Sequence, residues 1–261
     1  MKSKFKQIPK KIWERVSGIE PRRLWAELSN TQKELSNTRQ RQNRIHPYVA
    51  EALGLVAPVE YNLVKIDSQI GTSNSVFTEF GSDKDTRHSY GEFYFEFLNR
   101  FPNPKILEIG VGSVNNFPYA GLPPGGALKA FRKKFSNATI VGVDIDPVSI
   151  ESVKADGFFG FVVDQTSDES LSKSRIILNE FGPFDLIIDD GFHDPHANVR
   201  TLKMFFSLLS EKGTYVIEDV HESLIDFWKT ISVHLPGKIQ ILDMRTLRPS
   251  VDDNILILIT K

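Results

Sequence analysis

The fold is decided by residues 184–219, which read FDLIIDDGFHDPHANVRTLKMFFSLLSEKGTYVIED. The apolar run at 184–190 predicts a buried strand. The helical spacing of apolar residues at 196–210, closed by Gly213, predicts a helix. The run at 214–219 predicts a second strand. A strand, a helix and a strand in this order are typical of a parallel sheet whose faces are covered by helices.

The same alternation extends in both directions from this stretch. Apolar runs predict further strands at 105–110, 139–146, 159–164, 238–245 and 254–261. Periodic apolar positions predict helices at 128–135, 147–155, 169–181 and 223–235. No helix separates the last two strands, so we expect them to form an antiparallel hairpin. The sequence therefore predicts an α/β fold with a mostly parallel seven-stranded sheet, and the hairpin sets it apart from an all-parallel dinucleotide-binding fold.

The N-terminal part of the chain differs in composition from the rest. Residues 1–45 hold many Lys and Arg residues, and 8–45 predict a helical arm that is broken by Pro21. The pentapeptide ELSNT occurs there twice, seven residues apart, which is compatible with self-association. We interpret 1–77 as this arm and a connector, and 78–261 as the main domain, which begins with an aromatic-rich helix at 81–101. A basic arm can rest on an anionic membrane or a partner protein, but the pattern favours a solvated helix.

Composition excludes several classes of function. The 261 residues carry a net charge of -1, which argues against nucleic acid as a partner. The absence of Cys excludes a disulfide, a zinc thiolate site and a cysteine nucleophile. No apolar run follows the N-terminal charges, and none reaches the roughly 20 residues that span a bilayer. We expect a cytoplasmic enzyme.

Glycine and carboxylate residues follow the first two strands of the main domain. Gly110 and Gly112 lie in the segment EIGVG (108–112), where glycine lets the backbone approach a ligand, although a tight turn would also use it. Glu108 suits a cationic amino group. Asp144 can accept hydrogen bonds from both ribose hydroxyls of an adenosine cofactor. Asp146 either shares that role or caps the helix that begins at Pro147.

The third strand ends in Asp164 and Gln165, which can read the amino group and a ring nitrogen of adenine. The glycine loop does not continue as GxGxxG into a helix, so a pyrophosphate would lack its usual binding site at a helix N-terminus. S-adenosylmethionine has no phosphate. These features together predict S-adenosylmethionine as the cofactor and argue against a nicotinamide dehydrogenase.

A second acidic cluster is expected where two neighbouring strands end. Asp190 follows the strand at 184–190, and Glu218 and Asp219 follow the strand at 214–219. Three ionised carboxylates are costly to place together, and a bound divalent cation removes the conflict. Ligation by oxygen alone favours Mg²⁺, or Mn²⁺ or Ca²⁺, over zinc. Such a cation lowers the pKa of a substrate hydroxyl.

His193 is the candidate general base, because it lies on the loop after Asp190 and its ring has a suitable intrinsic pKa. His196 and His221 are alternatives. Any single His is also compatible with a surface position or a helix cap.

These motifs resemble the metal-dependent O-methyltransferases that act on sugars of macrolides such as mycinamicin, and their relatives in bacterial polysaccharide gene sets. The similar segments are FDLIIDDGFHDPHANVRTLKMFFSLLSEKGTYVIEDV (184–220), GSDKDTRHSYGEFY (81–94), KILEIGVG (105–112), GGALKAFRKKFSNATIVGVDID (125–146), VVDQTSD (162–168) and the tail 243–261. The resemblance covers about 78–261 and implies a class I S-adenosylmethionine-dependent methyltransferase with a Rossmann-like fold. It implies a sugar hydroxyl as acceptor, and it places Lys84, His88, Tyr90 and Tyr94 at the cofactor or substrate mouth.

The complete predicted site has three parts. The cofactor residues are Glu108, Gly110, Gly112, Asp144, Asp164, Gln165, Asp189 and Tyr90; the Mg²⁺ ligands are Asp190, Glu218 and Asp219; the base is His193.

The sequence departs from the family pattern at two places. Phe192 stands where the family usually has a small residue, and residues 115–126 are predicted to form an extended loop. We expect a homo-oligomer. The alternatives are a metal-independent small-molecule methyltransferase and a non-catalytic adapter of a glycan-assembly complex.

Overall fold

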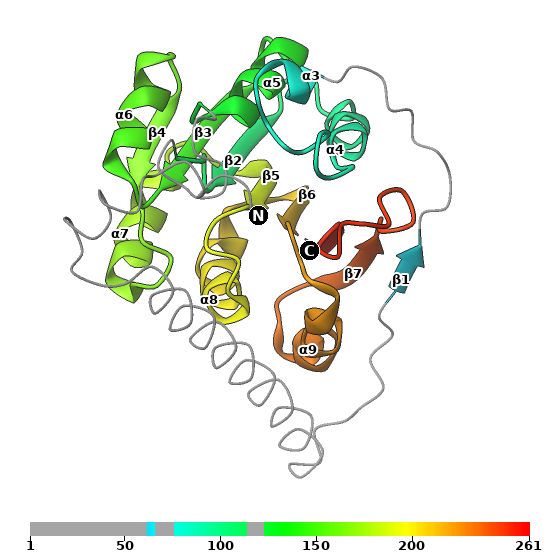
Figure 1. Cartoon of the computed structure of the whole chain (residues 1–261). Helices are drawn as coiled ribbons and strands as arrows, with labels where there is room; N and C mark the ends of the chain where they lie inside the picture. The colour runs from blue at the N-terminus through cyan, green and yellow to red at the C-terminus, as the bar shows by residue number, and fades with distance from the viewer. Residues whose placement is uncertain (1–61, 66–75, 114–122) are drawn as a thin grey trace, which may run out of the picture. The chain divides into compact units, whose positions relative to one another are not determined.

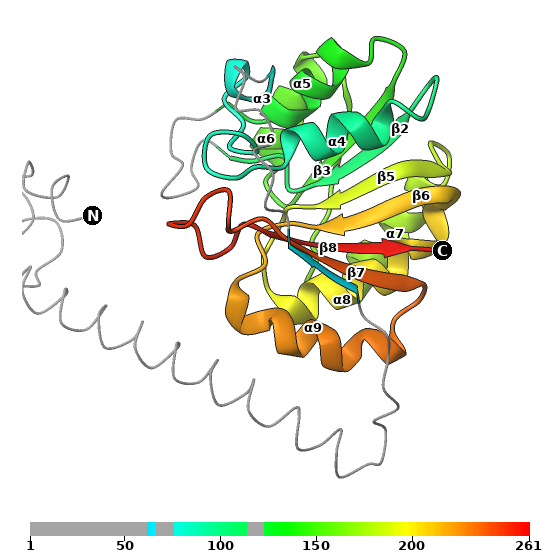
Figure 2. The same cartoon turned by 90° about the vertical axis from the view of Figure 1, so that its right-hand side faces the viewer.

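The sheet is built outward from β2 (Lys105–Ile109), which pairs in parallel with β3 (Thr139–Asp144) and with β5 (Phe184–Asp189). The computed structural model describes residues 62–65, 76–113 and 123–261. Within these ranges eight strands form one sheet in the order β1-β7-β8-β6-β5-β2-β3-β4. The other strands are β1 (Asn62–Lys65), β4 (Phe159–Val162), β6 (Leu209–Ile217), β7 (Lys238–Asp243) and β8 (Ile255–Thr260). β8 runs antiparallel to both β6 and β7, which confirms the predicted hairpin (Figure 2).

The strand at the β7 edge of the sheet comes from the predicted connector. β1 pairs in parallel with β7. The sheet therefore has eight strands among the described residues instead of the seven predicted, and the additional strand lies before residue 78. Residues 58–261 group as one compact unit. The predicted helical arm at 8–45 lies outside the described residues, and the proposed division at residue 78 stays a prediction.

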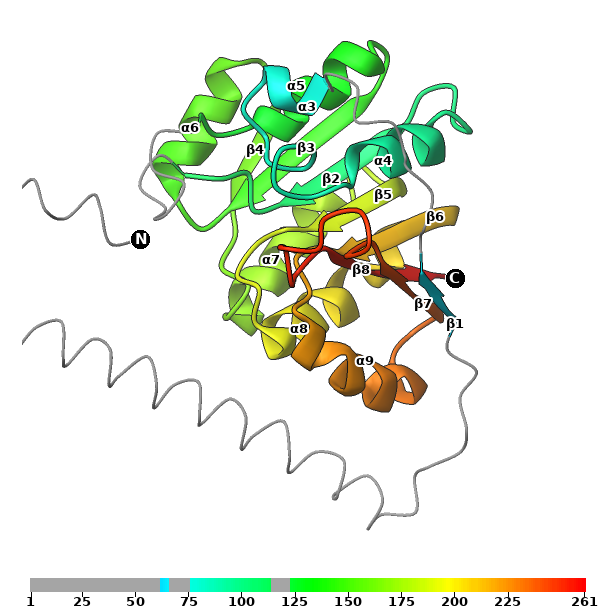
Figure 3. The ribbon, with the colours of Figure 1, turned by 45° about the vertical axis from the view of Figure 1, so that its right-hand side comes forward.

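Helices cover both faces of the sheet, because side chains along each strand alternate between them (Figures 1 and 3). Leu107 and Ile109 pack with α7 (Asp168–Leu178), α8 (Pro195–Phe205) and α9 (Ile225–Ile231). Ile106 packs on the other face. The helices of that face are α3 (Val76–Glu79), α4 (Gly91–Leu98), α5 (Gly126–Lys134) and α6 (Pro147–Ala155). No helix within the described ranges has the length and apolarity needed to cross a membrane.

Two helices begin at the loops that carry the candidate site. Asp146 caps α6, with its Oδ1 accepting a hydrogen bond from the Val148 amide at 2.9 Å, and Pro147 is the first helical residue. Asp194 caps α8 in the same way, accepting from the amides of His196 and Ala197. A carboxylate cap followed by proline fixes where the chain turns from strand to helix. These caps therefore hold the loops after β3 and β5 in place.

Four predicted helices are shorter in the structure, and one of them, predicted at 169–181, ends at Leu178. The helix predicted at 196–210 ends at Phe205, because a 3-10 turn follows (Phe206–Leu208) and Leu209 already pairs with Phe184 as the first residue of β6. The helix predicted at 223–235 is α9 flanked by the 3-10 turns Glu222–Leu224 and Ser232–His234. The helix predicted at 81–101 is reduced to α4. Tertiary pairing and packing override helical periodicity at these ends.

Candidate functional site

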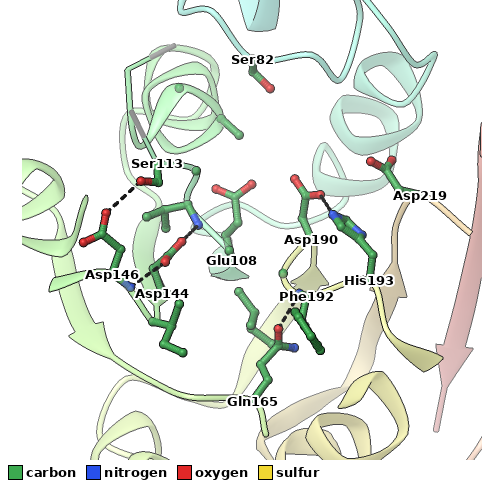
Figure 4. Close-up of a pocket in the computed structure, with 18 of the residues that line it drawn as sticks. Ser82, Glu108, Ser113, Asp144, Asp146, Gln165, Asp190, Phe192, His193 and Asp219 are labelled. Atoms are coloured by element: carbon green, nitrogen blue, oxygen red, sulfur yellow. Dashed lines mark hydrogen bonds and ion pairs between the residues drawn. The ribbon is translucent and has the colours of Figure 1, made fainter. Parts of the chain in front are cut away.

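A pocket of about 690 Å³ opens at the carboxyl ends of the central strands (Figure 4). Nine of the twelve predicted site residues line it: Glu108, Gly110, Gly112, Asp144, Asp164, Gln165, Asp190, His193 and Asp219. Tyr90, Asp189 and Glu218 do not line it. The structure therefore brings the predicted cofactor edge and most of the predicted metal cluster into one cavity.

The glycine loop after β2 serves two different purposes. Gly110 has φ of 87°, and a Cβ there would lie 2.2 Å from the backbone oxygen of Asp190. Gly112 has φ of 82°, and a Cβ there would meet no atom of the described residues within 4 Å. Gly110 thus allows two loops to cross, whereas Gly112 leaves open space at the pocket wall for a ligand to approach.

The two carboxylates at the end of β3, Asp144 and Asp146, make different contacts. Asp144 lines the pocket while its Oδ2 accepts from the Val111 amide at 2.9 Å and its Oδ1 accepts from the Asp146 amide at 2.9 Å. Burial raises the pKa of Asp144. Asp146 also accepts from the Ser113 hydroxyl at 2.8 Å and is the cap of α6. The predicted cap is thus confirmed, and because Asp146 also lines the pocket its share in ribose binding stays a prediction.

Two of the predicted cofactor residues, Asp164 and Asp189, already accept hydrogen bonds from groups within the protein. Asp164 accepts from the amide and hydroxyl of Thr166, and these hydrogen bonds lower the pKa of Asp164. Asp189 is fully buried, accepting from the Gln165 amide at 2.7 Å and the Tyr215 hydroxyl at 3.0 Å. Asp189 is therefore buried and does not line the pocket, and its side chain binds Gln165 and Tyr215 instead.

A buried ammonium group lies between three carboxylates. Lys84, 1 % exposed, places Nζ 2.7 Å from Asp190 Oδ2, 2.7 Å from Glu218 Oε2 and 3.3 Å from Glu108 Oε1. Burial alone would lower the pKa of Lys84, but the three carboxylates raise it well above its usual value. Burial raises the pKa of Glu108 to about 7 against the opposing effect of Lys84. Sequence reasoning placed Lys84 at the mouth by resemblance and missed this central position, since a single Lys in a polar segment carries no periodic signal.

The predicted metal cluster is only partly exposed to the pocket. Ligand atoms of Asp190, His193 and Asp219 lie within 4.8 Å of one another, a spacing that a cation could bridge. Glu218 instead accepts from the Tyr94 hydroxyl and from Lys84. Burial raises the pKa of Glu218 well above its usual value, and Lys84 opposes this shift.

The backbone is strained at two predicted site residues. His193 and Asp219 have φ of 53° and 54°, and they are the non-glycine residues with positive φ in the described part of the chain. This region is costly for residues with a Cβ and persists where surrounding contacts impose it, often at functional sites. His193 places Nε2 3.7 Å from Asp190 Oδ1.

The remaining predicted aromatic and histidine residues lie outside the pocket. The Tyr90 hydroxyl, which has one hydrogen to donate, lies 3.2 Å from Asp219 Oδ1 and 2.9 Å from the Asp253 carbonyl, so Tyr90 contacts the cluster without lining the pocket. His88 stacks on Tyr90 and lies 3.3 Å from Asp219. His221 caps a 3-10 turn, and the ring of His196 packs against Phe227. Neither alternative base lines the cavity.

Comparison with known proteins gives the family context. No family model matches the chain. It is 33% identical over 145 residues to the 8-demethyl-8-alpha-L-rhamnosyl tetracenomycin-C 2'-O-methyltransferase of Streptomyces olivaceus, covering 55% of this chain and 36% of the relative. It is 35% identical over 118 residues to the mycinamicin VI 2''-O-methyltransferase of Micromonospora griseorubida, covering 44% and 27%. This chain resembles the class I O-methyltransferases.

The similarity is confined to part of each relative. Matched segments span between 27% and 42% of the lengths of the five relatives. A solved structure of the MycE methyltransferase with Mg, SAH and mycinamycin VI aligns with a TM-score of 0.47 at 26% identity, covering 57% of this chain and 40% of that one. In this chain β8 lies between β6 and β7 and runs antiparallel to both. This strand order is read from the backbone hydrogen bonds of the chain itself.

Replacing Lys84 with Met should destabilise the protein in metal-free buffer. The change leaves three buried carboxylates without their cation, and breaking such a pair costs about 3–5 kcal/mol. Lys133→Met is the matched control, because Lys133 pairs with Glu79 on the surface and such pairs contribute about 0–1 kcal/mol. Urea unfolding measures both. Equal losses in the two variants would contradict a central role for Lys84.

Proposed function

We propose that this chain transfers a methyl group from S-adenosylmethionine to a hydroxyl of a sugar, assisted by a divalent cation, with His193 as general base. The observation that carries the proposal is the meeting of Glu108 and Asp144 with Asp190, His193 and Asp219 in one pocket. The relatives are named as O-methyltransferases of a rhamnosyl tetracenomycin and of mycinamicin VI. The acceptor class we propose is a sugar of a polysaccharide, glycolipid or glycosylated natural product.

The residues at the donor end fit S-adenosylmethionine. Glu108 Oε2 is buried and has no hydrogen-bond partner among the described residues, and Glu108 lines the pocket, so it can accept from the cationic amino group. Asp144 would accept from the ribose hydroxyls. Gly112 leaves room for close approach. The bound donor supplies an electrophilic methyl group.

The residues at the acceptor end fit an oxygen-preferring cation. Asp190 and Asp219 would hold Mg²⁺, with Glu218 as the third proposed ligand beside Lys84. A bound cation lowers the pKa of an acceptor hydroxyl. Asp190 Oδ1 also faces His193, so a negative charge adjoins the ring that would take the hydroxyl proton.

The acceptor wall includes an exposed aromatic side chain. Phe192 is 64 % exposed, lines the pocket and immediately precedes His193. Its ring can pack against the apolar face of a sugar or aglycone.

The basic arm at 1–45 is proposed to contact a membrane surface or a glycan-assembly partner, and the protein is proposed to be a cytoplasmic homo-oligomer.

A labelled methyl-transfer screen tests the proposed reaction. The donor is S-adenosylmethionine with a labelled methyl group, and the acceptors are nucleotide sugars, glycolipids and polysaccharide fragments. We expect label in a sugar methyl ether. Label only in a nitrogen or carboxyl acceptor would refute sugar O-methylation.

His193→Gln should lower kcat by about 10²–10⁴-fold, the usual contribution of a general base, while S-adenosylhomocysteine binding is retained. Steady-state assay and calorimetry measure the two quantities. His234→Gln is the control, because His234 is exposed and lies outside the pocket. An unchanged kcat in His193→Gln would exclude His193 as the base.

Removal of divalent cations with a chelator should abolish methyl transfer and leave S-adenosylhomocysteine binding largely intact. Added Mg²⁺ should restore the rate, since the proposed cation acts on the acceptor hydroxyl rather than on the donor. A fully active chelated enzyme would favour the metal-independent methyltransferase. Absence of any donor binding in the wild-type protein would instead favour the non-catalytic adapter.

A further inference from the structure

The amide of Gln165 connects the end of β4 to the loop that carries His193. We propose that Gln165 is a positioning residue that holds residues 190–193, and through them His193, in the geometry for proton transfer. This replaces the role of adenine reader expected from the sequence. The inference rests on the proposed function, because it assigns a support to the proposed base.

Both amide hydrogens of Gln165 are used inside the protein. Nε2 donates to Asp189 Oδ1 at 2.7 Å and to Thr201 Oγ1 at 3.3 Å. The Thr201 hydroxyl itself donates to the Ala197 carbonyl at 2.9 Å, so its oxygen is available as an acceptor. No amide hydrogen of Gln165 is therefore left to read a ring nitrogen of adenine.

The orientation of the amide is fixed by the groups on either side. Asp189 is fully buried and its carboxylate can only accept, so Nε2 must face it. Gln165 Oε1 consequently faces the other way and accepts from the backbone amide of Phe192 at 2.9 Å (Figure 4). This hydrogen bond attaches the side chain to the residue that immediately precedes His193.

The loop is held from two directions at very close range. On one side the Asp190 amide donates to the Ile109 carbonyl at 2.8 Å, and only a glycine at 110 allows the approach. On the other side a Cβ on Gly191 would lie 2.0 Å from Gln165 Oε1. The two contacts confine residues 190 and 191 between the β2 loop and the Gln165 amide.

This confinement accounts for the backbone of His193. A non-glycine residue with φ of 53° is strained and persists where its surroundings determine the conformation. The Gln165–Phe192 hydrogen bond is one such determinant, one peptide unit before the strained residue. Its loss lets the loop relax and moves the imidazole away from Asp190.

The test is Gln165→Met, which keeps the length of the side chain and removes its hydrogen bonds. Three quantities are measured: kcat, the Kd for S-adenosylhomocysteine by calorimetry, and hydrogen–deuterium exchange of the peptide containing Phe192. We expect kcat to fall on the order of 10²-fold, because small displacements of catalytic groups have effects of this size. We expect the Kd to change by less than about threefold, since the amide does not read the donor. Exchange at the Phe192 amide should accelerate.

A second variant keeps the inference testable if Gln165→Met does not fold. Gly191→Ala adds a methyl group that displaces the Gln165 amide, and it should give the same fall in kcat and the same faster exchange. Gln240→Met is the control, because Gln240 lies in β7 and does not line the pocket.

The outcomes separate the inference from the proposed function. A rise in Kd of about tenfold with unchanged exchange would overturn the inference and restore Gln165 as an adenine reader. If the wild-type protein transfers no methyl group, the proposed function fails. The exchange measurement then still decides whether Gln165 holds the loop, and unchanged exchange overturns that statement.

Discussion

The ion cluster around Lys84 is the interaction on which the rest of the site depends. Parallel strands bring their carboxyl ends to one edge, and β2, the loop after β5 and the loop after β6 each place a carboxylate there. Burying isolated carboxylates costs on the order of several kcal/mol each. The Lys84 ammonium, within 3.3 Å of all three groups, makes their burial possible. Lys84 also links the two parts of the site, because it pairs with Glu108 on the proposed donor side and with Asp190 on the proposed metal side.

Around this cluster the loops are fixed by close contacts of glycine residues with backbone and side-chain atoms and by side-chain caps. Gly110 and Gly191 are the points where the loop after β5 touches its neighbours, and neither has room for a Cβ. The caps at Asp146 and Asp194 fix the helices that follow. Among the described residues, His193 and Asp219 are the non-glycine residues with positive φ, a conformation that persists where surrounding contacts impose it. The molecule thus combines a rigid sheet edge with two strained residues at the place where the chemistry is proposed.

The sequence predicted the features that depend on local patterns and missed those that depend on distant contacts. Residues 147–155 form a helix over the predicted range, because Asp146 and Pro147 signal its start locally. The terminal hairpin follows from two apolar runs without a helix between them. Lys84, by contrast, becomes central only when three strands converge on it, and Asp189 turns inward because Tyr215 and Gln165 bind it there. The short strand β1 has no pattern that distinguishes it from a connector.

Anomalous diffraction from a crystal containing Mn²⁺ and S-adenosylhomocysteine tests most directly whether one pocket holds both a donor and a cation. The account predicts a single manganese peak within ligand distance of Asp190 and Asp219, with the adenosyl group beside Asp144. Manganese bound elsewhere, or an adenosyl group outside the pocket, would contradict it.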